Sequence, residues 1–135
     1  MKGITVGSYN LPDWEDSPEG FSRCLTALFQ HTPPTALIIG TIELFAATQQ
    51  FLLQKGIRVP QDVSIVCSDP HPTFAWCKTV SHISYDSRIW VRNTIRWVNK
   101  LARGENDRRQ VISKSKFIEG GTVGPAKPDA SRTSP

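Results

Sequence analysis

The sequence predicts an α/β fold, a parallel sheet flanked by helices, because two kinds of segment alternate along the chain. Residues 35–39 and 63–67 are short apolar runs rich in β-branched side chains, which is typical of strands buried on both faces of a sheet. Between them, residues 42–55 carry apolar side chains at helical spacing. A strand, a helix and a second strand in this order indicate a right-handed parallel βαβ unit.

The segment before this unit predicts one more strand and one more helix. Residues 4–8 are expected to form a short strand. Ser17 is suited to cap a helix that continues to about residue 30, with Pro18 at its first helical position.

The segment after the βαβ unit begins with a loop and returns to regular structure. Residues 81–85 are expected to form a strand. Asp86 is suited to cap a long helix that ends near Gly104. Residues 110–118 alternate enough for one or two further strands, and the tail from residue 125 is expected to be disordered.

Length and composition fit one compact domain. The chain has 135 residues, a net charge of +4 and 39% hydrophobic residues. No stretch approaches the roughly 20 apolar residues that a membrane-spanning helix needs. The first residues are too few and too polar for a secretory signal, so we expect a cytoplasmic protein without a membrane partner.

The three cysteines predict neither a disulfide framework nor a zinc site. Cys24, Cys67 and Cys77 are odd in number and lack Cys-x-x-Cys spacing. We interpret all three as small buried hydrophobic side chains and expect no metal and no cofactor.

The long helix after Asp86 is amphipathic. One face carries five cations, Arg88, Arg92, Arg96, Lys100 and Arg103. This face is either a solvated surface or a footprint for phosphate or nucleic acid. The other side carries apolar residues beside Trp90 and Trp97, so the helix must fold back onto its own sheet or meet a second chain. We therefore expect a homodimer or an exchanged helix.

A string of residues around the second strand of the βαβ unit resembles a known family. Residues 34–39 read Pro-Thr-Ala-Leu-Ile-Ile, and residues 56–66 read Gly-Ile-Arg-Val-Pro-Gln-Asp-Val-Ser-Ile-Val. Both resemble the sugar-sensing domain of LacI/GalR-family transcription regulators, which has a type I periplasmic-binding-protein-like fold. The resemblance covers residues 4–124. Residues 13–21 and 74–77 are similar to branches whose sensor follows a GntR-type DNA-binding head.

The resemblance implies a particular domain organisation. Residues 1–124 would form the C-terminal lobe of an effector-binding domain, with residues 125–135 as a tail. The helix at residues 86–103 would belong to the other lobe of the sensor. DNA would be bound only through a head domain that is not in this chain.

The resemblance also places ligand contacts at the ends of two strands. In the family, an acid after the second strand contacts a sugar hydroxyl, and Asp69 matches it, whereas Pro70 replaces a second acid. An Asn-Asp pair after the first strand is replaced by Thr41 and Ile42, which implies an altered or lost specificity. Independently of the family, Asp69 follows a strand of an open α/β sheet, where polar ligands bind. Capping of the following turn is the alternative role of Asp69.

Three aromatic residues are candidates for stacking on a sugar ring. Trp14 lies close to the position of a pocket aromatic in the family, and Phe74 and Trp76 follow Asp69 on one loop. Packing in the core or at its rim is the alternative for each.

We therefore expect a non-catalytic ligand-sensing domain of a bacterial transcriptional regulator, with a sugar-like small molecule as effector. A solute-binding protein of a sugar uptake system is the alternative. An enzyme is disfavoured because the sequence has no phosphate-binding loop, dinucleotide fingerprint or nucleophile elbow.

Overall fold

The computed structural model describes residues 12–126. In chain order their elements are α1 (Pro18–His31), β1 (Ala36–Ile39), α2 (Ile42–Gln54), β2 (Ser64–Cys67), the 3₁₀-helix η1 (Pro72–Ala75), β3 (His82–Tyr85), α3 (Ser87–Ala102) and β4 (Ser115–Ile118). The helices and strands expected within this range are confirmed, although only the end of the 110–118 segment is a strand. The strand expected at residues 4–8 lies outside the described residues, as does the tail from residue 127.

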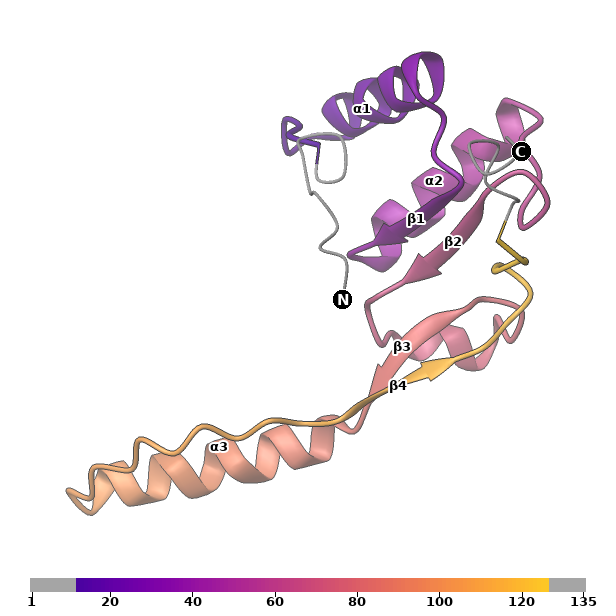
Figure 1. Cartoon of the computed structure of the whole chain (residues 1–135). Coiled ribbons are helices and arrows are strands. Elements are labelled where there is room, and N and C mark those ends of the chain that lie inside the picture. The colour runs from indigo at the N-terminus through magenta and orange to yellow at the C-terminus, as the bar shows by residue number, and fades with distance from the viewer. Residues whose placement is uncertain (1–11, 127–135) are drawn as a thin grey trace, which may run out of the picture.

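The strands form one mixed sheet in the order β1-β2-β3-β4 (Figure 1). β1 and β2 are parallel, with Ala36 opposite Ser64, which confirms the predicted βαβ unit. β3 is parallel to β2, and β4 is antiparallel to β3, with His82 opposite Ile118. β1 and β2 therefore end level with one another, at Ile39 and Cys67, and we call this end of the sheet the carboxyl edge. β3 begins at this level, with His82, and runs on beyond it.

The ends of the helices follow from local sequence. Ser17 caps α1 and Asp86 caps α3, each by accepting a hydrogen bond from a backbone N–H in the first turn. Gly56 and Gly104 lie just beyond α2 and α3 with φ angles of 67° and 75°. This left-handed conformation is strained for residues with a Cβ atom, so glycine suits both positions.

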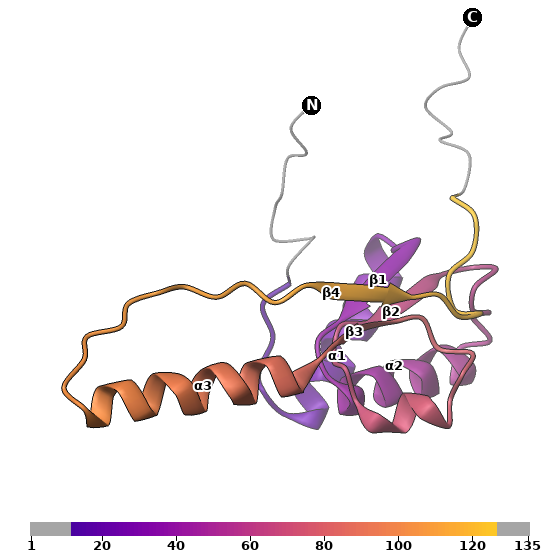
Figure 2. The same ribbon diagram turned by 90° about the horizontal axis from the view of Figure 1, so that it is seen from below.

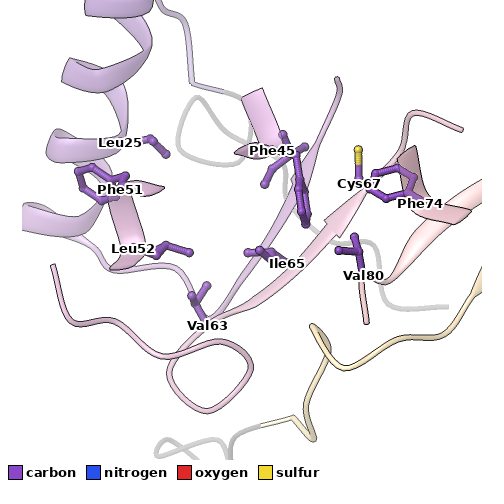
Figure 3. Packing of buried hydrophobic residues seen from close by; sticks show 10 residues of the cluster. Leu25, Phe45, Phe51, Leu52, Val63, Ile65, Cys67, Phe74 and Val80 are labelled. Carbon is purple, nitrogen blue, oxygen red and sulfur yellow. The ribbon is translucent and has the colours of Figure 1, made fainter. Parts of the chain in front are cut away.

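The core lies between the sheet and the helices on one of its sides (Figure 3). Phe45 and Leu52 of α2 and Ile65 of β2 are at most 1% exposed. Burying a side chain of this size stabilises the fold by about 1.5–3 kcal/mol. α2 is therefore fixed against β1 and β2, and its N-terminus is fixed at the carboxyl edge.

The other face of β1 is uncovered. Helices α1 and α2 lie on the same side of the sheet (Figure 2). Ile39 points to that side and is 6% exposed, whereas Ile38 is 80% exposed. The prediction that β1 is buried on both faces is therefore wrong for the part of the chain that the structure describes. The apolar run of β1 is as long as a doubly covered strand would require, but only one of its faces is packed.

The cysteines have three different environments, and all are free thiols. Cys67 is buried, as predicted, and burial raises the pKa of its thiol. Cys24 is half-buried. Cys77 is exposed, so the prediction of a buried side chain is wrong there. Phe74, three residues earlier, fills the core beneath this loop instead.

Helix α3 projects away from the rest of the chain (Figure 1), and none of its residues is buried. Residues 105–113 return alongside it, and the Trp97 indole N–H donates to the backbone oxygen of Asp107 over 3.1 Å. Trp90 remains 55% exposed and Trp97 47% exposed. Folding back onto the sheet, one of the two expected solutions for this apolar side, does not occur. Contact with a second chain stays a prediction.

Residues 120–124, which follow β4, bridge β2 and the start of β3 by hydrogen bonds, and we call them the clamp. The backbone oxygen of Thr122 accepts a hydrogen bond from the N–H of Ile65 in β2, at 2.9 Å. Its hydroxyl accepts one from the N–H of Ser81, next to β3, also at 2.9 Å. Thr122 is 7% exposed, so both bonds are shielded from water. The direct pairing of β2 with β3 is limited to Cys67 and His82, and the clamp extends it.

Candidate functional site

The carboxyl edge is held together where β1 and β2 end. The N–H of Ser68 donates to the backbone oxygen of Ile39 over 2.8 Å, and the Ser68 hydroxyl donates to the same oxygen over 3.2 Å. These bonds place the β1–α2 connection beside the loop that follows β2. Thr41 and Asp69, the two predicted polar contacts, come from these neighbouring connections.

Thr41 is the N-cap of α2. Its hydroxyl accepts a hydrogen bond from the N–H of Leu44, at the long distance of 3.4 Å. Thr41 is exposed, so its hydroxyl can also reach a molecule above the edge. The helix begins here because the Thr41 hydroxyl accepts a hydrogen bond from a first-turn N–H that has no acceptor within the helix.

Asp69 lies two residues beyond β2 and is half-buried. Its backbone oxygen accepts a hydrogen bond from the N–H of His71 over 3.0 Å, which shapes the turn into η1. His71 in turn caps η1, because its Nδ1 accepts from the N–H of Thr73 over 3.2 Å. Thus Asp69 contributes its backbone to the turn, and the capping side chain belongs to His71.

The structure adds a second carboxylate, Glu43, that the sequence interpretation missed. Its pKa is lowered first by a hydrogen bond from its own backbone N–H and then by one from the Thr41 side chain, with a smaller contribution from His71. The charges of Asp69 and Glu43 both contribute to the raised pKa of Cys67 at the end of β2, after burial as the main cause. Glu43 and Asp69 therefore both lie near Cys67 at the end of β2. The sequence could have indicated Glu43 through its position in the first turn of a helix that directly follows the carboxyl end of a strand.

The two aromatic residues of the loop after β2 have opposite environments. Phe74 is 5% exposed, its ring stacks on His82 at 4.5 Å between centroids, and it meets Phe45 edge-on at 6.1 Å. The structure therefore places Phe74 in the core, without a face for a ligand. Trp76, the C-cap residue of η1, is 90% exposed.

Trp14 lies away from this loop, under α1. A hollow of about 640 Å³ separates α1 from β1, and Trp14 lines it together with Ile38 and Gly40, among other residues. The Trp14 ring packs against Phe21 at 5.1 Å between centroids. Because Gly40 is the residue just past β1, this hollow opens next to the carboxyl edge, and Trp14 forms one of its walls.

Residues 12–126 hold neither a cluster of metal-ligating side chains nor a membrane-spanning helix. No group of three His, Cys, Asp or Glu side chains within residues 12–126 is arranged to hold a metal ion. None of the helices in this range combines the length and apolar character needed to cross a bilayer. Near the ends of β1 and β2, the side-chain oxygens include those of Thr41, Glu43 and Asp69.

The family follows from a comparison of the sequence with family models. Residues 5–123 match the model of the periplasmic binding protein-like domain. The chain belongs to this family. No curated protein matches the chain.

Solved structures share this periplasmic binding protein-like fold. A LacI family transcriptional regulator from Bifidobacterium animalis has a TM-score of 0.71 and 23% sequence identity, over 84% of this chain and 43% of that one. The transcription regulator CcpA of Lactococcus lactis has a TM-score of 0.68 and 14% identity, over 82% of this chain and 41% of that one. A sugar-binding LacI family regulator from Escherichia coli, solved with phosphate, has a TM-score of 0.69 and 15% identity, over 90% and 45%.

These comparisons confirm the predicted fold class. The chain spans less than half the length of these solved regulators. At this level of identity, the likeness concerns the fold, and the contacts to a ligand have to be argued from the residues of this chain.

Proposed function

We propose that this chain is an effector-sensing lobe of a bacterial transcriptional regulator, with its ligand at the carboxyl edge. The observation that carries the proposal is the pair of neighbouring connections that hold Thr41 and Asp69, joined by the Ser68 to Ile39 hydrogen bond. Open α/β sheets bind ligands outside the carboxyl ends of their strands. The regulators among the solved structures favour this function over uptake.

The proposed effector is sugar-like. A carboxylate accepts hydrogen bonds from hydroxyl groups, and the exposed ring of Trp76 is available for the apolar face of a sugar. Glu43 supplies a second carboxylate close to the position at which Ile42 replaces an acid of the family. Trp14, in the adjacent hollow, is the remaining candidate for contact.

In this proposal the lobe is not an enzyme and has no cofactor. Binding would close it against a second lobe, which would take helix α3, and would bias a DNA-binding head outside this chain. The regulator would be a cytoplasmic homodimer. The exposed apolar side of α3 supports a partner for this helix, since such surfaces rarely remain uncovered in soluble proteins.

Calorimetry with a panel of pentoses and hexoses on the full-length regulator tests the proposal. With the sugar that binds best, Asp69→Asn should weaken binding about 10- to 100-fold, because a hydrogen bond to a charged group contributes about 1.5–3 kcal/mol. Asp16→Asn, an equivalent change at an exposed position before α1, is the control and should bind as the parent does. Equal affinity of the Asp69→Asn variant and the parent would remove Asp69 from the site.

A further inference from the structure

The charge of this chain is concentrated in one segment. Residues 86–118 contain nine Lys and Arg and three Asp and Glu, a net charge of +6, whereas the whole chain carries +4. This segment comprises α3, the returning residues and β4, and most of it lies on the projecting part of the molecule (Figure 2). The rest of the chain is therefore slightly acidic.

The cations of α3 and of its C-cap residue form a regular row, which we call the basic face. Its members are Arg88, Arg92, Arg96, Lys100 and Arg103. Steps of four residues correspond to about 6 Å along a helix, so the row is about 22 Å long and covers about a third of the circumference. Asn99 lies within this face and Asn93 at one of its margins, and both add amide donors.

Three cations of the basic face have no ion pair among the described residues. Arg88 pairs with Asp86 at 2.9 Å, and Lys100 pairs with Asp107 at 2.8 Å. Arg92, Arg96 and Arg103 are exposed and make no such pair within residues 12–126. They are therefore available to an outside anion without the loss of an existing contact.

The apolar side of α3 lies opposite. Val91, Val98 and Leu101 are between 44% and 57% exposed and project from the other half of the helix. A second lobe that covers this apolar side would leave the basic face in solvent. The two faces can therefore have different partners at the same time.

We propose that the basic face of α3 binds the phosphate backbone of DNA without reading its sequence. The face carries five cations and a single aliphatic side chain, Ile89, with no aromatic residue, which is typical of phosphate contacts, whereas protein interfaces depend on clusters of buried aromatic or aliphatic anchors. Four of the five cations are arginines, whose guanidinium groups match phosphate oxygens in geometry. This contact goes beyond the proposed function, in which the head alone holds DNA, and it needs no effector.

Fluorescence anisotropy of the whole 135-residue chain with a short labelled DNA duplex tests this proposal. Each phosphate neutralised contributes about −0.9 to the slope of log K against log salt, so three free arginines predict a slope of about −3. Binding should weaken about 40-fold when the salt rises from about 50 to 200 mM. The double variant Arg92→Gln with Arg96→Gln should reduce this loss to about fourfold.

The matched control is Lys55→Gln with Lys78→Gln, which removes the same charge from the body and should keep the parental slope. Circular dichroism of both variants verifies that the helices persist. Equal slopes for the two variants would overturn the proposal, as would the absence of binding by the parent at about 50 mM salt. Binding to poly-glutamate as tight as to the duplex would overturn it too, because it would assign the face to an acidic protein. Effector calorimetry is independent of all these outcomes.

Discussion

Replacing Gly120 by alanine should destabilise the fold, because the clamp approaches the β2–β3 loop too closely for a Cβ atom. A Cβ built on Gly120 would lie 2.6 Å from the backbone oxygen of Thr79, 2.6 Å from the carbonyl carbon of Val80 and 2.8 Å from the nitrogen of Ser81. All three are backbone atoms, so no side chain can rotate to make room. The clamp itself would have to move.

The size of the effect follows from what that movement breaks. Overpacking costs about 1–3 kcal/mol. The N–H of Gly120 donates to the Ser81 hydroxyl over 3.0 Å, and the N–H of Gly121 donates to the oxygen of Thr79 over 2.6 Å. Weakening these two bonds adds about 1 kcal/mol each at most. We expect the free energy of unfolding to fall by about 2–4 kcal/mol, a large share of the 5–15 kcal/mol typical of a domain.

Urea unfolding followed by circular dichroism measures this difference. Gly121→Ala is the matched control, because its Cβ would lie 3.7 Å from the oxygen of Thr79, an ordinary van der Waals distance. We expect the control to differ from the parent by no more than about 0.5 kcal/mol. If Gly120→Ala unfolds at the parental midpoint, or if both variants lose the same stability, the close approach at Gly120 does not determine the fit of the clamp.

Three further predictions concern single side chains. Thr122→Val should lower the free energy of unfolding by about 1–3 kcal/mol in urea titrations, because the buried N–H of Ser81 loses its acceptor; an unchanged midpoint would contradict this. Asp86→Ala removes the cap of α3, worth about 0.5–2 kcal/mol, and should reduce helical circular dichroism, since α3 has no buried residue to compensate. Arg109 and then Lys100 hold the pKa of Asp107 well below its usual range. The stabilisation that the ionised Asp107 carboxylate gives to the returning residues is therefore present at pH values above the usual carboxyl pKa. It is lost as the pH falls through the lowered pKa. The protection of residues 105–113 against hydrogen exchange, taken relative to the intrinsic rate at each pH, should fall only in strong acid, whereas Asp107→Asn should lower this protection at neutral pH.

The sequence predicted the elements that depend on local signals. Caps at Ser17 and Asp86 and the left-handed glycines 56 and 104 have short-range physical causes, and the helices end where these residues predict. The parallel order of β1 and β2 was predictable because a strand, a helix and a strand have few possible arrangements. The family string at residues 56–66 identified the fold, which the family model confirms.

Features that depend on distant residues were not predictable in this way. Phe74 and Trp76 are two aromatic residues on one loop, and only the packing against Phe45 and His82 determines which of them is buried. The clamp depends on contacts between Thr122 and Ile65, which are far apart in the sequence. Glu43 was missed because a carboxylate in the first turn of a helix is already explained by its favourable interaction with the helix dipole, so its position did not indicate a ligand contact.

Helix α3 is attached to the sheet at two adjacent points, one at the end of β3 and one at the start of β4. Asp86 directly joins β3 to α3, and the returning chain enters β4 at Ser115, opposite Tyr85 at the end of β3. Any movement of α3 relative to the sheet must therefore be accommodated at these adjacent points, since β3 and β4 are paired along their whole length. These points lie beyond the carboxyl edge, because β3 begins level with the end of β2, at His82 opposite Cys67, and continues for three more residues. A ligand at the carboxyl edge that changes the position of a lobe bound to α3 would therefore act on these two connections through β3, which begins level with the end of β2.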